Sequence, residues 1–335
     1  MSPTEPHALP PRAAGGLGGA SIAPATVVVT MDTGVRVHVL DWGSVPSDGP
    51  PAFEGAATPA APVVVLVHGL LATAWTWAPV AHRLVGRARI LAPDLRGHGL
   101  SESPGEGYDL DSLAFDLLTV LTAHGLGPDV DGPAVILVGH GFGAQVAAWA
   151  AHLRPAAISG LVLIDGGWEE LEPALRMDAA EFQRGLDEPP EVLISMDAYL
   201  ADRRDWDPAS WDADQERAAR SAVDEKYAGR VALVVRRHAL SGCVASMFAY
   251  RPTTALAALD RPLVVLVAEP GGADDEDVRE RRLALDDLVS ARATAGVPPT
   301  RVVRFVGSAH NLMRYRPDEV CASIAGLLAV PQEAR

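Results

Sequence analysis

The chain is poor in cysteine. Only Cys243 and Cys321 are present among 335 residues, and they lie far apart in the sequence. Two such thiols argue against the disulfide framework that stabilises many small secreted domains. We therefore expect a reducing, cytoplasmic setting for this protein.

Positive charge and long apolar runs are also scarce. The sequence holds 28 Lys and Arg against 43 Asp and Glu, a formal net charge of −15. Because an acidic surface is repelled by phosphates, we expect no nucleic acid or membrane partner. No apolar run is long enough to span a bilayer. Residues 1–25 are rich in Ala, Gly and Pro and lack a signal-peptide core, so we expect a disordered N-terminal tail.

What the chain does contain is a regular alternation of short apolar runs with helical patterns. Strands are predicted at 26–30, 35–40, 63–67, 88–91, 135–138, 161–164, 263–267 and 301–306. Helices are predicted at 75–84, 110–124, 144–153, 277–293 and 317–330. Such alternation predicts an α/β fold with a doubly wound, mostly parallel sheet, whose ligands bind beyond the carboxyl ends of the strands.

The pattern changes between residues 168 and 259. This stretch has no strand-like apolar run, and helical segments rich in Glu, Asp, Arg and Ala dominate it. We interpret 168–259 as a helical lid inserted into a core formed by 26–167 and 260–330. The Pro- and Gly-rich stretch 44–61 is interpreted as a passive surface loop.

The stretch from Val135 to Gln145 combines a buried strand, a Gly-rich turn and a helix. Its glycines Gly139, Gly141 and Gly143 are two residues apart. This is the layout of the nucleophile elbow, G-x-S-x-G, in which a serine stands on a sharp turn. Here Gly141 occupies the serine position, and glycine has no oxygen with which to attack a carbonyl.

Three further turns follow the predicted strands in a recognisable order. They are His68-Gly69-Leu70, Asp94-Leu95-Arg96-Gly97-His98-Gly99-Leu100-Ser101, and the loop that contains His310. With the elbow, they make the chain resemble the α/β-hydrolase fold family over residues 26–330. The resemblance implies a serine–histidine–acid site with no metal or organic cofactor, and Gly141 as a degenerate nucleophile position.

The resemblance also assigns roles to particular residues. His310 matches the catalytic histidine, and the backbone N–H groups of Leu70 and Phe142 match the oxyanion hole. The acid that orients the histidine stays open. Asp274, in the turn after strand 263–267, and Asp165, after strand 161–164, are equal candidates, followed by Glu269.

Several other residues are candidates for substrate contact. His68, His140 and Trp168 lie in or beside the motif turns, where they would either bind substrate or brace the loops. The histidine spacings fit no zinc pattern. Cys243 is expected to be a buried structural thiol and not a substitute nucleophile.

Three functions are compatible with this sequence. In the first, His310 acts as a general base on water or on a substrate C–H group, without an acyl-enzyme, toward a small ester, lactone or other carbonyl compound. In the second, the protein is a pseudoenzyme that binds a small apolar ligand or a partner protein. In the third, it is a drifted or engineered variant of a serine esterase. The oligomeric state is left open.

Overall fold

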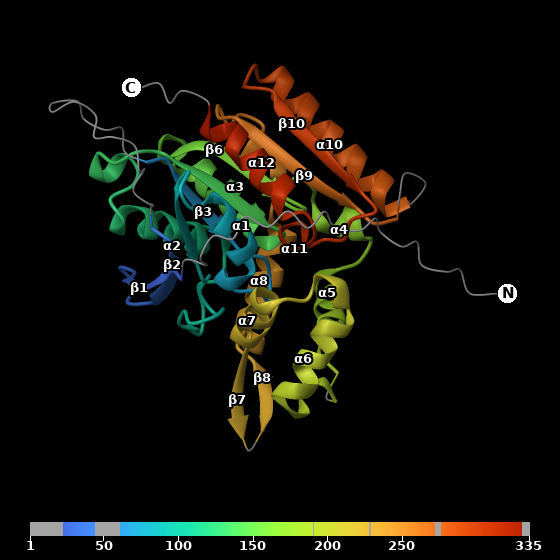
Figure 1. The fold of residues 1–335 in the computed structure, drawn as a ribbon. Coiled ribbons are helices and arrows are strands. Elements are labelled where there is room, and N and C mark those ends of the chain that lie inside the picture. The colour runs from blue at the N-terminus through green and yellow to red at the C-terminus, as the bar shows by residue number, and fades with distance from the viewer. Residues whose placement is uncertain (1–22, 44–60, 190, 228, 272–275, 330–335) are drawn as a thin grey trace.

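A computed structural model describes residues 23–43, 61–189, 191–227, 229–271 and 276–329 (Figure 1). An eight-stranded sheet forms its centre, in the order β1-β2-β4-β3-β5-β6-β9-β10. The strands are β1 Ala25–Thr30, β2 Arg36–Asp41, β3 Val63–Val67, β4 Arg89–Pro93, β5 Val135–His140, β6 Ile158–Ile164, β9 Leu263–Glu269 and β10 Thr300–Val306. The pairs β1–β2 and β2–β4 are antiparallel and the others are parallel. The mostly parallel α/β sheet predicted from the sequence is confirmed.

Helices cover both faces of the sheet (Figure 1). Along β3, Val63, Val65 and Val67 pack into one core cluster, while Val64 and Leu66 pack into another. The first cluster contains side chains of α2 (Leu110–Ala123), α3 (Phe142–Leu153) and α10 (Glu276–Thr294). The second contains side chains of α1 (Ala78–Leu84) and α12 (Pro317–Leu328). Because both faces are buried, the strands are continuous apolar runs and not alternating ones.

The segment between β6 and β9 is mostly helical. It holds α4 Leu171–Leu175, α5 Ala179–Gly185, α6 Met196–Asp205, α7 Ala213–Ser221, α8 Arg237–Ala249 and α9 Pro252–Leu256. In Figure 1 its helices α5, α6 and α7 lie together on one side of the sheet. The short helices are η1 Ala74–Trp77, η2 Pro128–Val130, η3 Pro155–Ala157, η4 Val192–Ile194, η5 Pro208–Ser210 and, before α12, α11 Leu312–Tyr315.

The expectation that this segment lacks strands is wrong. An antiparallel hairpin joins β7 (Val223–Tyr227) to β8 (Arg230–Leu233). Val223 and Val231 are buried in a small cluster of their own with Val192 and Tyr199. The charged residues between the few apolar ones hide this hairpin in the sequence.

Some predictions fall outside the described residues. They concern most of the 1–25 tail, nearly all of the 44–61 loop, and Asp274. Among the helices that the structure describes, none has the length and apolar character needed to cross a bilayer.

Close approach of backbones requires a glycine at 143. A Cβ placed there would lie 2.3 Å from the carbonyl oxygen of His68 and 2.4 Å from that of Val67. The first turn of α3 therefore packs directly on the end of β3. This contact fixes where the turn before α3 stands relative to the loop after β3.

We expect Gly143→Ala to lower the free energy of unfolding by about 1–3 kcal/mol, because the added methyl group overlaps backbone atoms that cannot rotate away. Gly105→Ala is the matched control, since a Cβ at Gly105 meets no atom within 4 Å. It should change stability by less than about 0.5 kcal/mol. Urea denaturation of both variants measures the difference, and equal stabilities would contradict the packing argument.

Candidate active site

The turn between β5 and α3 places Gly141 at the carboxyl edge of the sheet. Its backbone has φ 53° and ψ −117°, and it directly precedes the first residue of α3. Its N–H donates to the carbonyl of Ile164 at the end of β6, over 2.9 Å. A residue with a side chain adopts such backbone angles only under strain, so glycine suits this corner.

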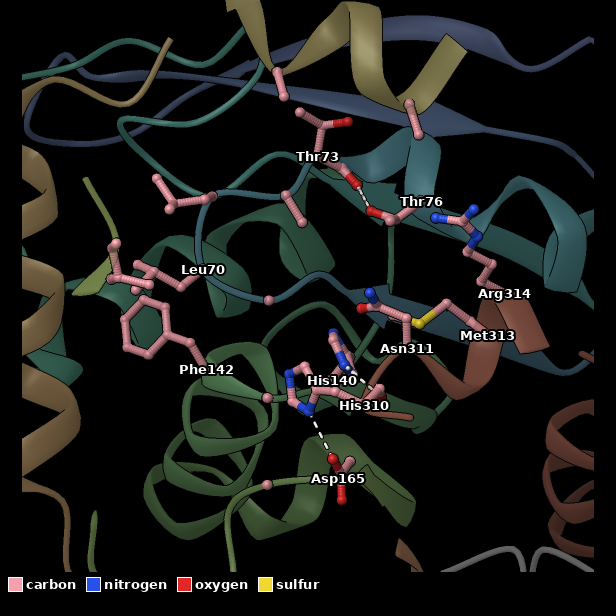
Figure 2. Close-up of a pocket in the computed structure, with 18 of the residues that line it drawn as sticks. Leu70, Thr73, Thr76, His140, Phe142, Asp165, His310, Asn311, Met313 and Arg314 are labelled. Carbon is pink, nitrogen blue, oxygen red and sulfur yellow. Dashed lines mark hydrogen bonds and ion pairs between the residues drawn. The ribbon is translucent and has the colours of Figure 1, made fainter. Parts of the chain in front are cut away.

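The loop after β10 brings His310 over this corner. A Cβ built on Gly141 would lie 3.2 Å from His310 Nε2 and 3.4 Å from its Cε1. On the other side of the ring, Nδ1 lies 2.6 Å from Asp165 Oδ2 (Figure 2). Because a carboxylate only accepts hydrogen bonds, Nδ1 carries the proton when the imidazole is neutral. The lone pair of Nε2 then faces the space above Gly141.

Asp165 is held as a buried carboxylate. Its Oδ1 accepts hydrogen bonds from the backbone N–H of Ala268, over 3.0 Å, and from Arg281, over 2.9 Å. Burial favours the neutral acid, but the hydrogen bond to His310 and the charge of Arg281 outweigh it, so the pKa of Asp165 is lowered. The carboxylate is therefore charged at neutral pH and can stabilise a protonated His310.

The structure distinguishes between the candidate acids that it describes. Glu269 is buried at the end of β9, but its carboxylate pairs with Arg282 and Arg304 and not with His310. The interpretation of Glu269 as the acid is therefore wrong, because these two arginines hold it on another side of the strand end. Asp274 lies outside the described residues, and Asp165 is the carboxylate in contact with His310.

His140 lies beneath His310 in the same site. The two ring centroids are 4.3 Å apart, and His140 Nε2 lies 3.2 Å from the carbonyl oxygen of His310. Since a carbonyl only accepts, Nε2 of His140 carries the hydrogen in this contact. Burial and the neighbouring charge of His310 lower the pKa of His140 to about 3. His140 is therefore a neutral support for the His310 backbone.

Two backbone N–H groups near Gly141 have no acceptor in the described part of the chain. Those of Leu70, after β3, and of Phe142, the first residue of α3, donate to no described residue. The first N–H groups of a helix have no partner within the helix. Figure 2 shows both residues on the same side of His310.

A cavity of about 910 Å³ opens above these groups. Gly141, His140, His310 and Asp165 form part of its floor. The 168–259 segment contributes much of the remaining wall, including Glu169, Tyr199, Arg203, Trp206, Trp211 and Met247. Within the described part of the chain, no group of three or more His, Cys, Asp or Glu side chains is placed to hold a metal ion.

Two of the predicted substrate-contacting residues do not line this cavity. The ring of His68 is fully buried between loops, accepting from the N–H of Leu95 over 3.0 Å and donating to the carbonyl of Gly69 over 2.8 Å. Trp168 is buried under Arg281, whose guanidinium lies 4.9 Å from the ring centroid. Each of these two side chains packs on neighbouring structure, whereas His140 does line the cavity, so only His140 of the three is placed for substrate contact in this structure. Cys243 is buried in α8 and its pKa is raised by burial to about 12, so it is not a reactive thiolate.

Sequence reasoning missed three charged residues of the site. Arg281 of α10 contacts both Asp165 and Glu169. Burial raises the pKa of Glu169, which lies in the cavity wall. Arg314 of α11 also lines the cavity. Arg281 stands within a helix and Glu169 in a turn, and neither belongs to a sequence motif. Arg314 lies four residues after His310, and this short separation was the one sequence signal of its place in the site.

The depressed pKa of His140 makes stability depend on pH. Its pKa is about 3 in the folded protein, against 6.5 ordinarily, so between these values the unfolded chain binds more protons. Stability therefore falls as the pH drops below about 6.5, and His140 accounts for about 2 kcal/mol between pH 7 and pH 5. Between pH 7 and pH 5 the free energy of unfolding of His140→Gln should therefore fall by about 2 kcal/mol less than that of the parent protein, measured by urea denaturation. Between pH 7 and pH 8 the difference in free energy of unfolding between the two proteins should stay constant. A difference that changes in this range would contradict the lowered pKa assigned to His140.

Comparison with known proteins gives the site its context. The lipase LipV of Mycobacterium tuberculosis is 34% identical over 167 residues, which cover 50% of this chain and 54% of LipV. Epoxide hydrolase A of the same organism is 39% identical over 135 residues, 38% of this chain and 35% of that protein. The chain thus spans about half or less of the length of these curated relatives.

Solved structures resemble the whole fold. The crystal structure of E-2-(acetamidomethylene)succinate hydrolase has a TM-score of 0.69 at 21% identity, covering 91% of this chain and 99% of that one. The thioesterase domain from the curacin biosynthetic pathway has a TM-score of 0.61 at 19% identity, covering 90% and 99%. The sequence pattern of the alpha/beta hydrolase family matches residues 64–323. With the sheet order and the turns described above, this match shows that the chain belongs to the alpha/beta hydrolase family.

Proposed function

We propose that this protein hydrolyses a small ester, lactone or related carbonyl compound by direct attack of water, without a covalent acyl-enzyme. Gly141 stands where the family's nucleophilic serine would stand. The single observation that carries the proposal is the position of His310, whose Nε2 faces the corner at Gly141 while Nδ1 is held by Asp165. A base in this orientation can take a proton from a water molecule at that corner.

The reaction would proceed in two proton transfers. A water molecule above Gly141 attacks the carbonyl carbon and gives a proton to His310 Nε2, so the imidazole becomes positively charged. The carboxylate of Asp165 stabilises that charge. When the bond from the carbonyl carbon to the leaving oxygen breaks, His310 returns the proton to this oxygen and the acid product leaves. General base catalysis of this kind contributes about 10²–10⁴-fold to the rate.

The backbone supplies the remaining catalytic group. During the attack the carbonyl oxygen gains negative charge, and the N–H groups of Leu70 and Phe142, which have no acceptor among the described residues, would stabilise it as an oxyanion hole. One such donor is typically worth about 10²–10³-fold in rate. Backbone donors do not depend on the side chain at 141, so the hole is independent of the missing serine.

We further propose that the 168–259 segment acts as a lid. Its Trp206, Trp211 and Met247 give the cavity an apolar wall that would hold the organic part of the substrate and exclude water from it. The names of the relatives, a lipase and an epoxide hydrolase, support hydrolysis as the reaction type. The substrate itself is inferred only as a small ester-type molecule.

A second candidate function is that of a serine esterase that has lost its nucleophile and retains ligand binding. One observation favours it: a Cβ at Gly141 would lie 3.2 Å from His310 Nε2, so a serine at this position would stand directly against the imidazole once the ring shifts by a few tenths of an ångström. Under this alternative the chain itself does not turn over esters.

Hydrolysis of p-nitrophenyl acetate and butyrate tests the first function. The parent protein should turn over at least one ester, and His310→Ala should lower kcat/KM by about 10²–10⁴-fold because the general base is lost. Asp165→Asn should also lower it, since Nδ1 loses the acceptor that orients the ring. A parent activity that survives in His310→Ala would show that the reaction takes place elsewhere.

Gly141→Ser separates the two candidates. Suppose that the parent shows no hydrolysis above the uncatalysed background and that Gly141→Ser exceeds this background by at least about 100-fold. The second function is then favoured and direct water attack is contradicted. A fluorophosphonate probe should then label Gly141→Ser and not the parent. Gly105→Ser, in an open loop, is the control and should gain neither activity nor label.

A further inference from the structure

Every described carboxylate of the cavity wall has an arginine beside it. Four described carboxylates line the cavity, and each lies within 4 Å of an arginine. The pairs are Asp165 and Glu169 with Arg281, Asp187 with Arg237, and Glu188 with Arg203. Each of these carboxylates thus already has a cation of the protein as its partner, although Arg281 alone serves both Asp165 and Glu169.

Arg314 is a cation of the same wall without such a partner. Among the described residues, no carboxylate lies within 4 Å of its guanidinium, and its hydrogen bonds go to neutral groups. Nε donates to the hydroxyl of Ser210 over 2.7 Å, and Nη2 donates to the carbonyl of Asp207 over 3.1 Å. Nη1 donates to no described residue. A guanidinium carries five N–H donors, so part of its hydrogen-bonding capacity is unused.

The position of Arg314 relates it to the reacting corner. It belongs to α11, which begins two residues after His310, and both residues line one cavity. Figure 2 shows Arg314 on the side of His310 away from Leu70 and Phe142. A molecule whose carbonyl group sits at the backbone N–H groups of Leu70 and Phe142 would therefore extend toward Arg314.

A half-buried arginine with a free fork of donors favours one kind of ligand. A carboxylate matches the planar guanidinium with two parallel hydrogen bonds, and such charged hydrogen bonds are about twice as strong as neutral ones. Ser210 and Asp207 hold the side chain in place beforehand, which reduces the entropy lost when the ligand binds.

We infer that Arg314 determines specificity by binding a carboxylate of the substrate, which is therefore a small carbonyl compound with a free acid group at the end remote from the reacting carbonyl. The reaction type rests on the proposed function, but the preference for an anion does not. It holds for binding alone, whether or not the bound molecule is hydrolysed.

Calorimetric titration with two non-hydrolysable ketones tests this inference. The probes are 6-oxoheptanoate, which is anionic, and 6-oxoheptanamide, which is neutral and has the same number of heavy atoms. The parent protein should bind the acid about tenfold more tightly than the amide. The preference should fall as salt is added, because the charges are only partly shielded from solvent.

Substitutions identify the side chain responsible. Arg314→Met should abolish the preference for the acid. Arg316→Met, which removes a positive charge from the same segment but outside the cavity wall, should retain it. Because Arg314 also contacts the 168–259 segment, Arg314→Gln serves as a second variant that still offers neutral donors to Ser210 and Asp207, and it should lose the preference as well.

Three results would overturn the inference. They are equal binding of the two ketones by the parent, a preference that persists in Arg314→Met and Arg314→Gln, and equal weakening of both ketones in these variants, which would make Arg314 only a support for the 168–259 segment. A protein that shows the expected preference but no esterase activity would contradict the proposed function and leave the role of Arg314 intact.

Discussion

The hydrogen bond between His310 and Asp165 determines what this site can do. It joins the loop after β10 to the end of β6, and it fixes which nitrogen of the imidazole carries the proton. The carboxylate stays charged although it is buried, because Ala268 and Arg281 occupy its other oxygen. The remaining groups matter only in relation to this pair: His140 supports the backbone of His310 from below, and Gly141 lies under the free nitrogen.

The fold and the corner at Gly141 were predictable because local patterns specify them. Strands buried on both faces must be continuous apolar runs, and glycines two residues apart mark a tight strand-to-helix turn. The β7–β8 hairpin was missed because only a few residues, such as Val223 and Val231, are buried there and charged residues separate them. A small satellite core leaves too short an apolar pattern to be read from sequence.

The identity of the acid shows a different limit. Asp165 and Glu269 both stand at the end of a parallel strand at the same edge of the sheet, so the sequence ranked Asp165, level with Asp274, above Glu269 but did not exclude Glu269. Their neighbours separate them, since Arg282 and Arg304 pair with Glu269 while His310 contacts Asp165. Arg281 and Arg314 were missed for a related reason. A single charged residue on a helix has the same sequence signal whether it faces solvent or a cavity.

The bare backbone at residue 141 also has a consequence for folding stability. Any residue with a side chain would be held there in an unfavourable conformation at a cost of about 1–3 kcal/mol, which glycine largely avoids. The greater freedom of glycine in the unfolded chain offsets about 0.5–1 kcal/mol of that gain. Glycine at this corner therefore gives the folded protein a margin of stability, and any side chain placed there would have to be kept by a benefit other than folding.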